Sequence, residues 1–226
     1  MSQGKIITIE GLDGCGKKTQ SKELAKNLRI NCYGCYLISF PRYHTPTGKV
    51  IKDHQDNKTL DKLSLEKITE IYAKDRFEAQ KDILFWIGFH DTIVVNDRYI
   101  ESNMAYQGAR LFDIRKKVWE YIYGIEIKKL GNRPSDIVIL LDMPAEYSAR
   151  AMKDQERVLD VNECNLDYQK KVRTCYLELS KIYNWNVINC LREDKSRKTD
   201  QDISKEIYCC VQKQLPVTIN ETNKYL

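Results

Sequence analysis

A strand, a glycine-rich loop and a helix start within residues 5–20 constrain the fold more than any other stretch of this chain. Residues 6–9 read Ile-Ile-Thr-Ile, which predicts a buried strand, and the pattern G-x-x-x-x-G-K then runs from Gly11 to Lys17. In such a loop, backbone N–H groups and the positive end of the helix bind phosphate, while the lysine reaches the β and γ oxygens of a nucleotide. Because the loop follows a strand and precedes an amphipathic helix, we predict a phosphate site rather than an ordinary turn.

One position departs from the usual pattern of this loop. A Ser or Thr commonly follows the lysine and binds Mg²⁺ through its hydroxyl, but here Lys18 stands in that place and Thr19 follows it. Since a lysine side chain offers donors only, we expect Thr19 or a carboxylate to hold the metal, or the metal site to be weakened. The residues predicted to bind ATP are Gly11, Leu12, Asp13, Gly14, Cys15, Gly16, Lys17, Lys18 and Thr19.

Composition sets broad limits on the kind of protein. The chain has 226 residues, 42% of them hydrophobic and 31% charged, which is the balance of a globular domain. The net charge of +5 is spread along the sequence, so it does not call for nucleic acid but suits a small anionic substrate. We expect a cytoplasmic protein without membrane spans, because no signal peptide or long apolar run is evident. The eight cysteines lack convincing metal spacing and are predicted to be free thiols.

Strand patterns alternate with helix patterns along the whole chain, which predicts a three-layer α/β/α sandwich around a mostly parallel, five-stranded sheet. We expect a single domain over residues 1–215, followed by a tail at 216–226. The region 44–63 reads as a loop with a short helix near residues 50–51, and 153–165 reads as a mobile charged segment. Further strands are predicted at about 35–40, 92–97, 136–142 and 184–189. Helices are predicted at about 17–28, 64–86, 102–111, 114–130, 144–152, 166–183 and 200–214.

Candidate site residues lie at the ends of two of the predicted strands, at Phe40–Tyr43 and at Asp97 and Arg98. In open α/β sheets the carboxyl ends of the strands border one crevice, so these segments can meet the phosphate loop and the charged stretch 153–163. Transfer of a phosphoryl group depends on positioning and charge neutralisation more than on covalent chemistry. We therefore expect a phosphoryl-transfer site to contain an acidic residue at a strand end and several arginines near a metal.

Several motifs, in order along nearly all of residues 5–215, resemble those of thymidylate kinases. They are Glu-Gly-Leu-Asp-Gly-x-Gly-Lys-x-Thr-Gln (10–20), Phe-Pro-Arg-Tyr (40–43), Asp-Arg-Phe-Glu (75–78), Asp-Arg-Tyr-x-x-Ser-Asn-x-Ala-Tyr-Gln-Gly (97–108), Leu-Asp-x-Pro (141–144) and Asp-x-x-Glu (160–163). The block at 97–108 is far more specific than the phosphate loop alone. The resemblance implies a P-loop kinase fold with a lid near 150–165. It also implies Mg²⁺-dependent transfer of the γ-phosphate of ATP to dTMP, giving ADP and dTDP for dTTP synthesis, by a homodimer.

The resemblance also implies roles for residues that would bind the monophosphate. Tyr72 would stack on thymine, Arg76 would donate to thymine O4, Asn103 would contact the base near N3, and Tyr106 would crowd the sugar 2′ position. Arg98 and Tyr43 would meet the acceptor phosphate. The predicted substrate-binding residues are Asp13, Phe40, Pro41, Tyr43, Tyr72, Arg76, Arg98, Asn103, Tyr106 and Gln107.

Two lid arrangements occur in the family that this chain resembles. One has a catalytic basic residue directly after the Asp of the phosphate loop, and the other has glycine there and basic residues in the lid. This chain has Gly14 at that position and Lys153 and Arg157 in the lid region, so it is similar to the second, bacterial-type arrangement. Arg157 is expected to act on the transferred phosphate, and Arg150 to brace the lid helix.

The predicted catalytic residues are Lys17, Arg98, Asp97, Arg157 and Lys153. Lys17, Arg98 and Arg157 would spread the charge of the moving phosphoryl group, and Asp97 would help to order the metal and Arg98. The predicted metal-binding residues are Asp13, Glu163 and Thr19.

Other interpretations of the same residues stay open at this point. Tyr72 on the apolar face of a helix would usually be core, and Asp97 could cap the next helix. The nearest alternative activity is a kinase for another pyrimidine nucleoside monophosphate, such as UMP or CMP. A second alternative is an inactive nucleotide-binding regulatory protein, and Lys18 is the only residue that supports it. A nucleic-acid-associated ATPase is disfavoured, because no basic stripe or array of stacking aromatics is present.

Overall fold

A computed structural model describes residues 4–153 and 165–215, and five parallel strands form its single sheet. The order is β2-β3-β1-β4-β5, with β1 in the centre and Ile7 opposite both Val95 and Ile137. The strands are β1 (Lys5–Gly11), β2 (Gly34–Ser39), β3 (Thr92–Asp97), β4 (Ile137–Asp142) and β5 (Asn186–Asn189). The predicted α/β class and five-stranded sheet are confirmed, and every strand pair in the sheet is parallel.

Helices connect successive strands, as parallel pairing requires. Ser64 caps α3 by accepting a hydrogen bond from the Lys67 N–H at 3.2 Å, as its place before an amphipathic run predicts. The α-helices are α1 (Lys17–Ile30), α2 (Pro46–Asp56), α3 (Leu65–Ile87), α4 (Ile100–Arg110), α5 (Arg115–Tyr123), α6 (Ala145–Lys153), α8 (Leu166–Ile182) and α9 (Asp200–Gln212). Short 3₁₀ turns cover Leu60–Lys62 and Phe112–Ile114.

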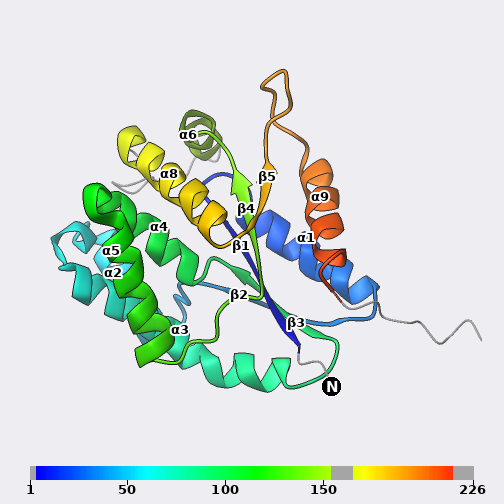
Figure 1. The fold of residues 1–226 in the computed structure, drawn as a ribbon, viewed down its shortest axis with the longest axis horizontal. Helices are drawn as coiled ribbons and strands as arrows, with labels where there is room; N and C mark the ends of the chain where they lie inside the picture. The colour runs from blue at the N-terminus through cyan, green and yellow to red at the C-terminus, as the bar shows by residue number, and fades with distance from the viewer. Residues whose placement is uncertain (1–3, 154–164, 216–226) are drawn as a thin grey trace, which may run out of the picture.

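Helices cover both faces of the sheet, and two separate hydrophobic clusters lie between the layers. Figure 1 shows α1 and α9 on one side of the strands and α4, α5 and α8 on the other. Alternate residues of β1 point to opposite faces, so Ile6 packs with α3, α4 and α8 while Ile7 packs with α1 and α9. The central strand is thus buried on both faces, which explains its continuous apolar pattern.

Two segments differ from the prediction. The region 44–63 holds a full helix, α2, because the Thr45 side chain accepts from the Gly48 N–H and Pro46 suits the first helical turn. The helix predicted over 114–130 instead divides into α5 and a π-helical segment, η3 (Gly124–Lys129), where the Leu130 N–H donates to the Ile125 carbonyl. A π-helix of this kind is often found at a functional site. Within the described residues no helix combines the length and the apolar character needed to cross a membrane.

Candidate active site

A cleft of about 770 Å³ opens beyond the carboxyl ends of β1, β2 and β3. Two backbone hydrogen bonds bring these ends together: the Phe40 N–H donates to the Asp97 carbonyl at 3.0 Å, and the Arg98 N–H donates to the Ile9 carbonyl at 3.1 Å. The predicted site residues that line the cleft are Asp13, Gly14, Gly16, Lys17, Lys18, Thr19, Phe40, Pro41, Tyr43, Tyr72, Arg76, Asp97, Arg98, Asn103, Tyr106 and Gln107. Gly11, Leu12 and Cys15 are buried beneath it.

The phosphate loop leaves β1 at Gly11 and enters α1 at Lys17. Gly11 has φ +143°, and a Cβ there would lie 2.6 Å from the Leu141 carbonyl oxygen, so only glycine fits. The Lys17 ammonium folds back over the loop. It donates to the Leu12 carbonyl at 2.7 Å and lies 3.6 Å from the Asp13 carboxylate. A backbone carbonyl of the loop thus holds the positively charged Lys17 ammonium in place.

Cys15 lies inside the phosphate loop but has no access to solvent. Burial raises the pKa of its thiol, although the Lys17 and Arg98 charges act in the opposite direction. The thiol form is therefore favoured, which makes Cys15 a small packing residue of the loop.

Asp13 and Arg98 form an ion pair at the floor of the cleft. The Tyr106 hydroxyl donates to the second Asp13 oxygen at 2.8 Å, and the Arg98 guanidinium donates to the Ser102 hydroxyl at 3.2 Å. Burial disfavours the carboxylate, but the charges of Arg98 and Lys17 outweigh it and hold the pKa of Asp13 well below its usual value. Both members of the pair are therefore charged and oriented before any ligand binds.

Arg98 adopts φ +67°, a left-handed conformation that is unfavourable for residues other than glycine. Such backbone strain is often found at functional sites. Glu10 stabilises the segment around Arg98, because its buried carboxylate accepts from the Tyr99 and Ser102 N–H groups at 2.8 and 3.1 Å. The sequence gives Glu10 no visible role, since a carboxylate within a buried strand becomes interpretable only once α4 is placed.

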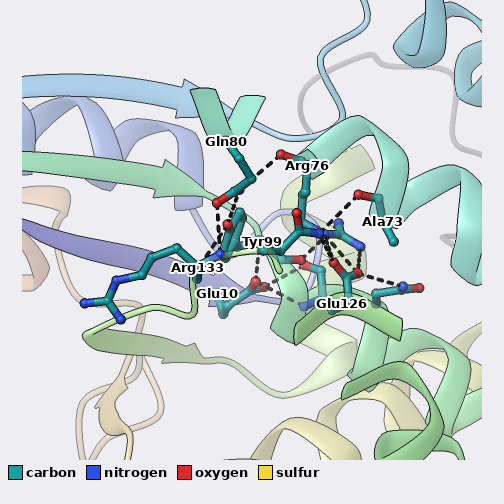
Figure 2. Close-up of polar contacts among 10 residues, drawn as sticks. Glu10, Ala73, Arg76, Gln80, Tyr99, Glu126 and Arg133 are labelled. Carbon is teal, nitrogen blue, oxygen red and sulfur yellow. Dashed lines mark hydrogen bonds and ion pairs between the residues drawn. The ribbon is translucent and has the colours of Figure 1, made fainter. Parts of the chain in front are cut away.

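At the other end of the cleft, Arg76 extends from α3 and is 2% exposed. Its Nε donates to the two Glu126 carboxylate oxygens at 3.1 and 3.2 Å, and its Nη1 donates to the Tyr99 carbonyl at 3.4 Å. Figure 2 shows this guanidinium directed toward Glu126. Burial lowers the pKa of Arg76, but the Glu126 carboxylate outweighs that effect, so Arg76 stays charged. No motif predicts Glu126, which lies 50 positions away.

Several other polar residues of the site have no sequence signal. The Tyr168 hydroxyl donates to the Tyr106 carbonyl at 2.8 Å, and the Ser148 hydroxyl donates to the Asp13 carbonyl. In the loop 192–199, the Arg197 guanidinium lies next to Gly16, 3.3 Å from where a Cβ of that glycine would stand. A cation thus lies beside the phosphate loop.

Part of the predicted lid lies outside the described residues. Arg157 and Glu163 fall there, as do the side chain of Lys153 and most of the predicted mobile segment. Arg150 is described, and its guanidinium lies 5.8 Å from the centre of the Tyr147 ring.

The central strand, phosphate loop and strand-end cleft together define a P-loop nucleotide-binding kinase. The family model for thymidylate kinase matches residues 9–203. The chain is 30% identical to a probable thymidylate kinase of Pyrococcus horikoshii, over 94% of this chain and 98% of that protein. It is 30% identical to the thymidylate kinase of Mycobacterium tuberculosis, over 77% and 85%. The chain therefore belongs to the thymidylate kinase family.

A solved structure shows that the fold is shared as well. The structure of thymidylate kinase from Candida albicans matches this one with a TM-score of 0.73, over 94% of this chain and 92% of that chain. The sequence identity between the two is 23%, so this likeness concerns the fold.

Proposed function

We propose that the protein transfers the γ-phosphate of ATP to dTMP, giving ADP and dTDP, in the cytoplasm and within one domain that spans residues 1–215. The observation that carries this proposal is the continuity of the cleft. It joins the phosphate loop to the Arg76 end, and Arg98 is held by Asp13 of the loop. A donor nucleotide on the loop and an acceptor nucleotide at the other end would bring their phosphates to the Arg98 region.

In this mechanism, Lys17 and Arg98 neutralise the charge that spreads over the oxygens of the transferred group. Asp13 holds Arg98 in place, so the cation does not have to reorganise during the reaction. The predicted lid cations, Lys153 and Arg157, would add positive charge and exclude water, which would otherwise hydrolyse ATP. The acceptor phosphate would also contact Tyr43 and the backbone of the segment 40–43.

Magnesium is the divalent metal that we propose for this site. The Asp97 carboxylate lines the cleft, and no hydrogen bond or ion pair engages it among the residues that the structure describes. Thr19 is exposed on the cleft, whereas both Asp13 oxygens already bind Arg98 or Tyr106. Asp97 and Thr19 both line the cleft and can offer oxygen ligands to a cation, with Glu163 a further proposed ligand. When bound, Mg²⁺ supplies charge neutralisation between the phosphates.

The Arg76 end of the cleft suits a thymine base. Asn103 Oδ1 and Gln107 Oε1 are buried without a hydrogen-bond partner in the described part of the chain. Buried acceptors of this kind are costly unless a ligand donates to them, and thymine offers a donor at N3. Arg76 would donate to thymine O4, Tyr72 would stack on the ring, and Tyr106 would border the sugar.

A substrate panel tests the proposed activity. ADP release is measured with ATP and Mg²⁺ against dTMP, dUMP, UMP and CMP in reducing buffer. We expect the highest kcat/KM with dTMP. Preference for UMP or CMP would contradict the proposed base recognition, and ATP binding without turnover would favour the regulatory alternative.

We also infer that the protein forms a homodimer, as the family resemblance implied. Large apolar side chains of α3 and the turn after it are exposed: Phe77 by 48%, Phe85 by 64% and Phe89 by 54%. Single exposed apolar residues need no partner, but several on one helix indicate an interaction surface. Light scattering should give twice the mass of the chain, and Phe85→Glu should shift it to the monomer.

A further inference from the structure

Glu126 lies in the π-helical segment η3 and is fully buried. Its carboxylate accepts hydrogen bonds from three side chains that reach it from different elements: Arg76, Asn103 and Asn132. We propose that Glu126 is a positioning residue that sets the hydrogen-bond polarity of the base-binding end of the cleft. This inference rests on the proposed function and concerns how the site distinguishes one pyrimidine from another.

The first part of the argument is the orientation of Arg76. A guanidinium carries five N–H donors, and here Nε and Nη2 are directed to Glu126 while Nη1 donates to the Tyr99 carbonyl (Figure 2). Held along this edge, Arg76 still has an Nη N–H for a ligand, and it lines the cleft. Glu126 thus turns Arg76 into a fixed donor.

The second part is the orientation of the Asn103 amide. Its Nδ2 donates to Glu126 Oε1 at 3.4 Å, whereas its Oδ1 is buried without a partner within residues 4–153 and 165–215. A carboxylate only accepts hydrogen bonds, so it selects the amide rotamer that directs the NH₂ group toward Glu126. The oxygen of Asn103 is then left as the acceptor for a ligand.

The third part is the support of Glu126 itself. Asn132 Nδ2 donates to Glu126 Oε2 at 2.7 Å and to the Ala73 carbonyl of α3 at 3.2 Å, and the Asn132 N–H donates to the Glu126 carbonyl at 2.9 Å. Glu126 is therefore fixed to the helix that carries Arg76. The π-helical segment η3 thus carries a side chain that is hydrogen-bonded to both α3 and α4, through Arg76 and Asn103.

These orientations favour one class of base. Thymine and uracil carry a donor at N3 and an acceptor at O4, whereas cytosine carries an acceptor at N3 and a donor amino group at C4. A fixed Arg76 donor and a fixed Asn103 acceptor complement the first pattern and oppose the second. The Glu126 carboxylate fixes both the Arg76 donor and the Asn103 acceptor. A glutamine amide at position 126 could accept a hydrogen bond from Asn103 or donate one to it, and so would not fix the orientation of Asn103.

Glu126→Gln tests the inference, with Glu120→Gln as the matched control, because Glu120 is exposed on the neighbouring α5. The measured quantities are kcat and KM for dTMP and dCMP, and KM for ATP. We expect Glu126→Gln to lower the kcat/KM ratio of dTMP over dCMP at least about tenfold, which is the effect of one charge-assisted hydrogen bond. The loss should appear in the KM for dTMP, with the KM for ATP unchanged.

Glu126→Asp covers the case in which the glutamine variant fails to fold. It keeps the charge but withdraws the carboxylate by one methylene, so a smaller fall in the same ratio is expected. The double variant Asn103→Ala with Glu126→Gln should lower the kcat/KM ratio of dTMP over dCMP by less than the product of the two single-variant fold-changes. The effects are not independent, because both substitutions act on the same contact with the base.

The outcomes separate the inference from the proposed function. A folded Glu126 variant that keeps the wild-type dTMP preference would overturn the positioning role alone. Equal losses for dTMP and dCMP would also overturn it, because they would indicate a general structural role. A wild-type protein that prefers dCMP would instead overturn the proposed substrate.

Discussion

Arg42 is bound to Asp75 through both its backbone and its side chain. The Arg42 N–H donates to Asp75 Oδ2 at 2.9 Å, and its Nε donates to Asp75 Oδ1 at 3.1 Å. Its Nη2 reaches the Asp75 carbonyl at 2.6 Å and Glu78 at 3.4 Å. Two motifs separated by 33 positions therefore form one structural unit, which anchors the segment after β2 to α3 at the edge of the cleft.

Replacing Asp75 should destabilise the protein strongly, because the carboxylate is 1% exposed and its loss leaves Arg42 without its main partner. We expect Asp75→Ala to lower the free energy of unfolding by about 3–5 kcal/mol, measured by urea denaturation. The more exposed Glu78 is the control, and Glu78→Gln should cost under about 1 kcal/mol. Equal stability of Asp75→Ala and the wild type would refute the anchoring role.

Removing the Arg98 guanidinium should affect turnover rather than ATP binding. We expect Arg98→Ala to lower kcat for dTMP at least about a hundredfold, because a preorganised cation near the transferred group is lost. ADP release gives kcat, and titration with a non-hydrolysable ATP analogue gives the affinity. Arg115→Ala is the control, since Arg115 pairs with Glu178 on α8 outside the cleft. Normal turnover of Arg98→Ala would exclude the proposed role.

Lys18 should limit the affinity for the metal. Changing Lys18→Ser supplies the hydroxyl ligand that the loop usually offers, so the Mg²⁺ concentration for half-maximal rate should fall several-fold. Lys22→Ser removes an exposed lysine of the same helix that does not line the cleft, and it should leave the Mg²⁺ requirement unchanged. An unchanged or higher requirement in Lys18→Ser would mean that position 18 does not approach the metal.

Glu101 should make stability depend on pH. Burial, reinforced by the charge of Glu10, raises its pKa from 4.5 to about 8, although the Ser135 hydrogen bond and the Arg76 charge act in the opposite direction. The folded protein therefore keeps a proton on Glu101 that the unfolded chain loses above about pH 4.5. Because the unfolded state binds fewer protons in this range, the free energy of unfolding falls as the pH rises from about 4.5 to about 8.

In Glu101→Gln the side chain at position 101 is neutral at every pH, so the fall in stability with rising pH is removed. Its stability relative to the wild type should therefore be higher at about pH 9 than at about pH 5, by a few kcal/mol. Urea denaturation at the two pH values measures the difference. The same relative stability at both would show that Glu101 is already ionised in the folded protein.

Close packing at Gly108 predicts a further stability effect. A Cβ at this position would overlap the Trp119 indole nitrogen, which donates to the Met104 carbonyl at 3.0 Å. Gly108→Ala should cost about 1–3 kcal/mol through overpacking. Gly124→Ala is the matched control, because in the described part of the chain nothing beyond its chain neighbours and its own helix backbone lies within 4 Å of the added methyl group. This variant should be neutral or stabilising. Thermal denaturation compares the two, and equal melting temperatures would contradict the steric argument.

Local patterns were sufficient for the elements and for the phosphate loop. The strand predicted at 92–97 has the bounds of β3, and Ser64 caps α3 as its position indicates. These features depend on neighbouring residues: a continuous apolar run makes a buried strand, glycines permit the loop, and a hydroxyl caps the helix. The order of motifs also indicated which residues meet, and most of the predicted site residues line one cleft.

Long-range contacts account for what the sequence did not show. The helix pattern over 114–130 contains no sign that the backbone widens into a π-helix at Gly124. Nothing near Arg76 in sequence indicates that its counter-charge is Glu126, and the apolar strand around Glu10 conceals its bonds to α4. Residues that are close in sequence determine the local backbone conformation and which face of a helix or strand is apolar. The partner of a buried charge depends on which helices pack together, and only the tertiary structure decides that.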